Sequence, residues 1–194
     1  MSTIEAKKDL ILKYEERFAY ELGLVIIPKP KVSVWMILIP IIFVFHLYRH
    51  KKYVEGRRAF ADNYLISRRR AADETAEEIR QDRPVNLDAL SAKAKLPSKE
   101  AHRDYREWLT VLMAHYRNLL TAQADDFNAL VRLAYRSRSN YLLTLNQLSK
   151  AEKKLNATLR PHLEKETEGI ADVIADIERN STRLRRVHAQ TVFP

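Results

Sequence analysis

Cysteine is missing from all 194 residues of this chain, and glycine occurs only three times. Without cysteine there is no disulfide framework, no thiolate zinc or iron–sulfur site and no cysteine nucleophile. Scarce glycine, together with abundant Ala, Leu, Glu, Lys and Arg, argues against a β-sandwich or barrel and favours helices. The composition therefore predicts an all-α protein.

The motifs of common enzyme active sites are also lacking. The sequence contains no Gly-rich phosphate loop, no HExxH zinc motif, no paired-glycine dinucleotide fingerprint and no nucleophile elbow. Its six histidines show no convincing pattern of metal ligands. We therefore expect a non-enzymatic protein with no catalytic residue, no metal site, no cofactor and no small-molecule substrate.

Lysine and arginine outnumber aspartate and glutamate by 34 to 25, which gives a formal net charge of +9. Such an excess indicates an acidic partner, either anionic lipid headgroups or nucleic acid. No nucleic-acid-binding module can be recognised in the sequence. Anionic lipid is therefore the favoured acidic partner, and nucleic acid is the less favoured one.

One stretch is free of formal charge: residues 32–48, of which eleven are Val, Ile, Leu or Phe. Inserting these side chains into a bilayer would gain about 3–6 kcal/mol, less the cost of the polar residues among them. The run is apolar on every side, and Trp35 and Tyr48 stand near its ends like interface aromatics. We predict a membrane segment in preference to a buried core helix of a soluble protein. The residues expected to insert are Trp35, Ile37, Leu38, Ile39, Pro40, Ile41, Ile42, Phe43, Val44 and Phe45.

The way in which this segment sits in a membrane is left open by the sequence. Seventeen helical residues reach about 25 Å, slightly less than a hydrocarbon core of about 30 Å. Pro40, in the middle, would kink or break a helix. A single kinked span and a re-entrant anchor both fit. Basic residues are more numerous after the run than before it, which places the C-terminal part on the cytoplasmic side.

Basic residues follow the run directly and suit contact with anionic headgroups, which is worth about 1 kcal/mol per residue close to the surface. The expected headgroup contacts are Arg49, Lys51, Lys52, Arg57 and Arg58. Arg68, Arg69 and Arg70 would lie about 30 Å further along a helix that leaves the membrane perpendicularly. We therefore expect these three on a solvated or partner-facing surface.

The remainder of the N-terminal half divides into helices and short connectors. Residues 1–31 hold an amphipathic helix over 3–22, followed by a Pro/Lys connector. That helix either packs on the rest of the protein or lies on lipid headgroups. A basic juxtamembrane helix is expected within 49–82, and residues 83–98 read as a linker with a short helix over 87–95.

The C-terminal part, residues 99–194, has the pattern of a helical hairpin or coiled-coil bundle with antiparallel helices. Apolar residues recur every seven positions at Phe127, Ala134, Tyr141, Leu148 and Leu155, and again at Leu163, Ile170, Ile177 and Leu184. Ser98 is expected to cap the first helix. Breaks are expected at 124–126 and before Pro161. The last helix is expected to end near Arg186, with a loose tail over 189–194.

This architecture leads to a functional hypothesis without a specific activity. The leading hypothesis is a membrane-anchored scaffold or tether whose cytoplasmic bundle binds a protein partner or a second copy of itself. The heptad positions are expected to supply the contact surface. The alternatives are a small accessory subunit of a membrane enzyme complex and, third, a basic helical nucleic-acid-binding protein.

Overall fold

The computed structural model describes residues 2–26, 53–94, 96–165 and 169–194, without the side chains of 53–57 and 59. In these residues it contains seven α-helices and no strand, so the predicted all-α class is confirmed. The helices are α1 (Ile4–Ile26), α2 (Tyr53–Gln81), α3 (Leu87–Ala92), α4 (Lys99–Thr121), α5 (Phe127–Tyr135), α6 (Arg138–Leu163) and α7 (Ile170–Val192).

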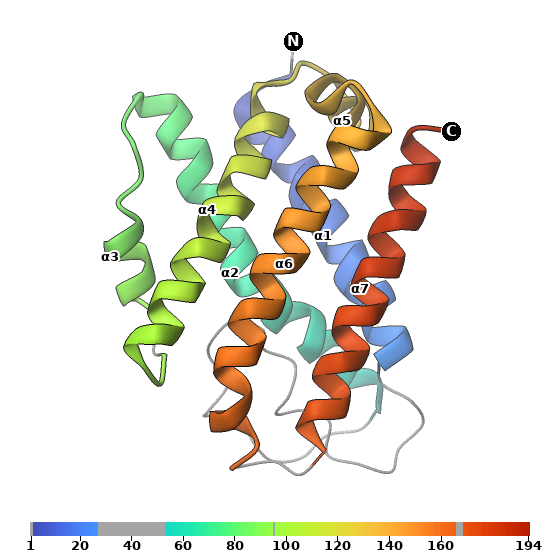
Figure 1. Cartoon of the computed structure of the whole chain (residues 1–194). Coiled ribbons are helices and arrows are strands. Elements are labelled where there is room, and N and C mark those ends of the chain that lie inside the picture. The colour runs from blue at the N-terminus through green and yellow to red at the C-terminus, as the bar shows by residue number, and fades with distance from the viewer. Residues whose placement is uncertain (1, 27–52, 95, 166–168) are drawn as a thin grey trace.

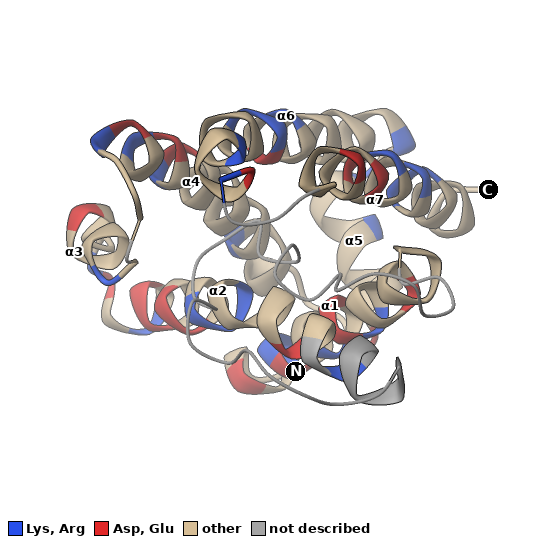
Figure 2. Ribbon diagram, turned by 90° about the horizontal axis from the view of Figure 1, so that it is seen from below, with Lys and Arg blue, Asp and Glu red and all other residues tan. Residues whose placement is uncertain are grey.

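The long helices form a bundle of two layers (Figure 2). α1 and α2 pack side by side in one layer, and α4, α6 and α7 pack in the other, with α3 against α4. Neighbouring helices within each layer run antiparallel, as expected for the C-terminal part (Figure 1). Both chain termini lie at one end of the bundle, opposite the C-terminus of α1 and the N-terminus of α2.

Each long helix buries one stripe of side chains against its neighbours. On α4, Trp108, Leu112 and Tyr116 are fully enclosed, because apolar residues three or four apart share one side of a helix. α1 contributes Ile11 and Leu22 to the interior, so it packs on the rest of the protein, one of its two predicted placements. The bundle is therefore not confined to residues 99–194.

The heptad residues are part of this interior. Tyr141, Leu148 and Leu155 on α6 are buried, and so are Ile170 and Ile177 on α7. The expectation that these positions supply a surface for a partner is wrong, because α1, α2, α4, α6 and α7 use such apolar stripes to pack on one another.

Three helices begin as local side-chain chemistry suggests. Ser98 Oγ accepts a hydrogen bond from the Ala101 N–H at 3.0 Å, which confirms the predicted cap of α4. The expected break at 124–126 is also confirmed, because Asp126 caps α5. α3 starts after Asn86 but ends at Ala92, earlier than predicted.

The heptad series from Phe127 to Leu155 does not belong to one helix. Arg136 adopts a left-handed conformation with φ 62°, and Ser137 Oγ accepts a hydrogen bond from the Asn140 N–H at 3.2 Å. Ser137, which lies between Ala134 and Tyr141 of the series, is therefore the N-cap of α6. A seven-residue repeat does not detect this turn, because both helices present apolar residues to the same core.

Three predicted helix ends are wrong as well. α1 continues through the buried Gly23 to Ile26 instead of ending near residue 22. Pro161 lies in the last turn of α6 and does not start a new helix. α7 continues past Arg186 to Val192, since Ala189 and Val192 are buried and hold the expected loose tail against the core.

Candidate functional site

Most of the predicted membrane site lies outside the described residues. This applies to the whole run 32–48 with its ten expected inserted residues, and to Arg49, Lys51 and Lys52 among the headgroup contacts. Arg57 belongs to α2, but its side chain is also outside the description, whereas Arg58 is exposed on the same helix. Among the described helices, none combines the length and the apolar character needed to cross a membrane.

The described residues nearest to the run do include exposed apolar side chains. Tyr20 is 50% exposed, Leu24 44% and Val25 45%, all in the last turns of α1. Tyr20 and Leu24 are four residues apart, so they lie on one side of the helix, while Leu22 and Ile26 are buried against the bundle. The sequence prediction treated residues 24–26 as a connector and missed this surface.

A network of four charged side chains occupies the interior between the two layers. It joins Glu15 of α1, Arg68 of α2, Glu152 of α6 and Arg185 of α7. Arg68 donates from Nε to Glu15 Oε2 at 3.0 Å and from Nη2 to Glu152 Oε1 at 2.7 Å. Arg185 donates to the same Glu152 carboxylate at 2.6 and 2.8 Å. Two arginines and two glutamates thus balance one another in a place that excludes most water.

Neutral side chains of α4 and α2 surround this network. Tyr116 Oη donates to Glu15 Oε1 at 2.8 Å, and Trp108 Nε1 lies 3.5 Å from Glu152 Oε1. The Arg68 guanidinium carbon lies 3.8 Å from the centre of the Tyr64 ring, within the range of a cation–π contact. Tyr64 Oη is itself buried and has no hydrogen-bond partner within the described residues.

The electrostatics favour the charged form of each of three network members. Burial alone would raise the pKa of Glu152, but the charges and hydrogen bonds of Arg185, together with Arg68, hold it at about 2. Burial opposes the charge on both arginines, yet the neighbouring carboxylates raise the pKa of Arg68 and Arg185 above the ordinary value. The network is therefore an ionic connection between four helices.

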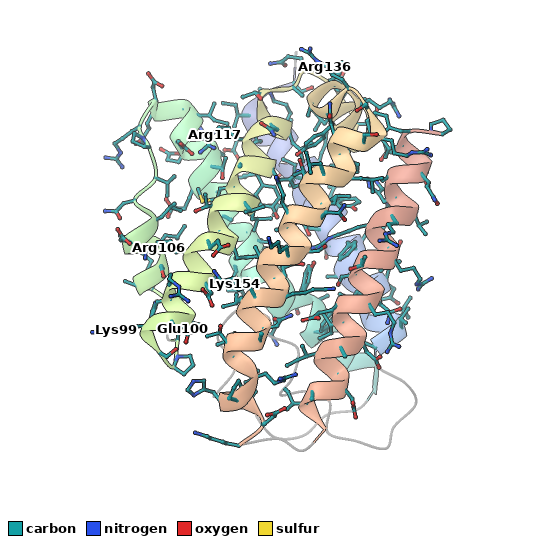
Figure 3. The ribbon with its side chains drawn as sticks, viewed as in Figure 1. Lys99, Glu100, Arg106, Arg117, Arg136 and Lys154 are labelled. Carbon is teal, nitrogen blue, oxygen red and sulfur yellow. The ribbon has the colours of Figure 1, made fainter. Side chains whose placement is uncertain are left out.

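Other ion pairs lie on the outside of the bundle and are more exposed than the buried network. Lys154 of α6 pairs with Glu107 of α4, and Arg117 of α4 pairs with Glu78 of α2 at 2.5 Å (Figure 3). The Lys154 and Glu107 side chains are 44% and 51% exposed, against 1% for Arg68. Exposed pairs of this kind contribute little to stability.

The burial of Arg68 and Arg185 corrects the sequence prediction. Arg68 was expected on a solvated or partner-facing surface, and no role in the interior was predicted for Arg185. A signal was present, because Arg68 continues the four-residue row of Phe60 and Tyr64, both buried. Arg185 likewise stands four residues before the buried Ala189.

A second polar cluster surrounds His188 of α7. Its Nδ1 lies 3.1 Å from Tyr141 Oη and its Nε2 3.1 Å from Asn128 Oδ1, while its ring lies 4.6 Å from the Tyr14 ring. Burial, assisted by the positive charge of Arg17, lowers the pKa of His188 to about 4. A neutral imidazole fits these contacts, since one nitrogen can donate to Asn128 and the other accept from Tyr141.

These clusters have the character of structural elements. The cavity beside the network, between Tyr64, Asn156 and Arg185, measures about 10 Å³, enough for a single water molecule. Within the described residues no group of three or more His, Asp or Glu side chains could hold a metal ion. Comparisons of the chain with protein-family models, curated proteins and solved structures give no match.

Proposed function

We propose that this protein is a non-enzymatic, membrane-anchored helical scaffold. Residues 32–48 attach it to a membrane, and the helical bundle binds a protein partner on the cytoplasmic side. The proposal rests on one observation, the seventeen successive residues without a formal charge, whose insertion would gain several kcal/mol. Attachment raises the local concentration of the bundle for anything that it binds at the membrane.

The described helices support the distinction between this run and a core helix. Each long helix of the bundle has charged residues along its sequence as well as a buried apolar stripe, as α4 shows with Arg106 and Glu107 next to Trp108. Residues 32–48 have no such polar side to present to water. The hydrocarbon core of a bilayer can surround apolar side chains on all sides of such a helix.

A partner of the bundle has to use its outer surface, since the heptad positions are buried. Exposed basic residues are spread along α5, α6 and the turn between them: Arg132, Arg136, Arg138, Lys150 and Lys153. Figure 3 shows Arg136 at the end of the bundle where this turn lies. A protein with an acidic surface is the complementary partner.

The anchor is tested with the full chain in vesicle flotation after a high-salt wash. Ile39→Asp with Ile42→Asp places two charges in the run and is expected to move the protein from the floating to the soluble fraction. The matched control, Leu143→Asp with Val187→Asp, makes the same change at positions that are 60% and 50% exposed, and should float like the wild type. Flotation of the Ile39/Ile42 variant at wild-type level would contradict the proposal.

The scaffold role is tested by extraction in mild detergent followed by identification of the proteins that co-purify. A scaffold is expected to be stable when purified alone and to retain a partner, or a second copy, through the α5–α6 surface. A protein that is unstable when purified alone, and that co-purifies in fixed ratio with larger enzyme subunits, would favour the accessory-subunit hypothesis. Retention of nucleic acid by a non-floating protein would favour the third hypothesis.

A further inference from the structure

We infer that residues 2–26 and residues 53–194 lie on the same side of the membrane, with the joined ends of α1 and α2 facing the bilayer. The inference rests on the proposed anchor and extends it, because the sequence leaves both a single span and a one-sided attachment open. The packing of α1 distinguishes between them.

α1 is an integral part of the bundle and cannot be separated from it by a membrane. Its Glu15 belongs to the buried network, 3.0 Å from Arg68 Nε and 2.8 Å from Tyr116 Oη. Near the other end, Lys7 Nζ donates to the Ala122 carbonyl at 3.0 Å and Ser2 Oγ to the Ala124 carbonyl at 2.8 Å. These contacts tie the first half of α1 to α2, to α4 and to the residues that follow α4.

The chain leaves and re-enters the bundle at the same end. Phe18, Leu22 and Ile26 in the last turns of α1 form one apolar cluster with Phe60 and Tyr64 near the start of α2. Figure 1 shows these two helix ends together, away from both termini. A single crossing between residues 26 and 53 would place α1 and α2 on opposite sides of the membrane, which their packing excludes.

The length of the connecting segment excludes a second possibility, in which it crosses the membrane twice. Two complete helical crossings need about 40 residues, and only the 26 residues from 27 to 52 stand between the two helices. An attachment that keeps both helices on one side and still uses the uncharged run must therefore approach the bilayer from that side alone.

The end of the bundle that would face the membrane has the surface for it. Tyr20, Leu24 and Val25 are exposed there, and the uncharged run starts seven residues after Val25. Exposed apolar residues combined with a tyrosine are typical of a protein surface at the headgroup level of a bilayer. Arg58, the sixth residue of α2 and exposed, adds a positive charge suited to anionic lipid. The occupant we assign to this surface is the lipid interface.

The absence of cysteine makes the orientation directly measurable with single-cysteine variants of the full chain. Asp9→Cys on α1 and Gln190→Cys on α7 are both at exposed positions. In sealed right-side-out and inverted vesicles, a membrane-impermeant maleimide is expected to label both variants in the same preparation and neither in the other. Labelling of the two variants from opposite sides would overturn the inference while leaving the anchor intact. Recovery of both variants only in the soluble fraction would instead overturn the anchor and the orientation together.

A second measurement tests which end faces the lipid. Leu24→Cys and Leu143→Cys replace exposed leucines at opposite ends of the bundle and can each carry an environment-sensitive fluorophore. In vesicles that contain headgroup-quencher lipids, the label at position 24 is expected to be quenched at least several-fold more than that at position 143. Equal quenching of the two labels would overturn the proposed lipid-facing end.

Discussion

Arg185 and Glu152 face each other as a two-point ion pair inside the bundle, with guanidinium nitrogens 2.6 and 2.8 Å from the two carboxylate oxygens. Glu152 also binds Arg68, so a single carboxylate joins α6 to α2 and α7. Burying such charges costs several kcal/mol per ion, which good geometry only partly returns. The network therefore defines how the layers fit together more than it adds to stability. It connects the α1–α2 pair, which flanks the proposed anchor, to the rest of the bundle.

Removing the shared carboxylate should be strongly destabilising. Glu152→Gln leaves Arg68 and Arg185 buried without a full counter-charge, so we expect the free energy of unfolding to fall by about 3–5 kcal/mol. Glu107→Gln, at an exposed ion pair with Lys154, is the control and should cost less than about 1 kcal/mol. Urea unfolding of the full chain in detergent, followed by circular dichroism, measures both. Similar losses for the two variants would show that burial of the network does not matter.

The same pair should show strong coupling in a double-mutant cycle. Glu152→Leu leaves the buried Arg185 without a carboxylate, and Arg185→Leu leaves two buried carboxylates with Arg68 alone, whereas the double variant removes one charge of each sign. We expect the double variant to lose less stability than the sum of the single losses, by about 0.5–3 kcal/mol. Additive losses in the same urea experiment would mean that the two residues act independently despite their contact.

Two buried tyrosines near the network should respond differently to loss of their hydroxyl group. Tyr64 Oη has no hydrogen-bond partner in the described part of the chain, so Tyr64→Phe should change stability by less than about 0.5 kcal/mol or raise it. Tyr116 Oη donates to Glu15, so Tyr116→Phe should cost about 1.5–3 kcal/mol. Thermal unfolding of the two variants side by side provides the comparison. A larger loss of stability for Tyr64→Phe than for Tyr116→Phe would contradict the assignment of the hydrogen-bonded hydroxyl to Tyr116.

Headgroup binding should depend on the basic residues that follow the uncharged run. Replacing Arg49, Lys51, Lys52, Arg57 and Arg58 by Gln is expected to weaken partition to anionic vesicles, most clearly at low salt. The control removes five exposed charges elsewhere, replacing Arg132, Arg136, Arg138, Lys150 and Lys153 by Gln. Vesicle sedimentation at two salt concentrations measures both variants. Equal weakening by the two sets would indicate a general charge effect and no specific headgroup site.

Features set by neighbouring residues were the ones that sequence reasoning predicted well. The cap at Ser98 depends on one side chain and a backbone N–H three residues later, so the sequence contains the whole interaction. The apolar stripe with Trp108 and Leu112 follows from helical spacing alone. Most helices and the break at 124–126 were therefore predictable, whereas the turn at Arg136 and the ends of α1, α6 and α7 were not.

Features set by distant residues could not be read in the same way. Arg68 can be buried because Glu15 and Glu152, 53 and 84 residues away in the sequence, bind its guanidinium group. The sequence around Arg68 shows only a run of three arginines. The membrane-facing surface at Tyr20 and Leu24 likewise depends on which side of α1 the bundle covers. Both required the packing of α1 against α2 and α4, which periodicity does not specify.

Stability should decline between about pH 6.5 and 4 because two histidines are held neutral in the folded chain. Burial lowers the pKa of His188 to about 4 and that of His115 to about 3, from an ordinary value of 6.5. Below pH 6.5 the unfolded chain therefore binds more protons than the folded chain. This stabilisation is complete above pH 6.5 and is lost as the pH falls. For each histidine, the free energy of unfolding falls by up to about 1.4 kcal/mol per pH unit. Glu152 adds to the loss only below about pH 4.5. His188→Gln should flatten the slope of unfolding free energy against pH between 6.5 and 4.5. An unchanged slope in His188→Gln would show that the contacts with Tyr141 and Asn128 do not exclude the proton.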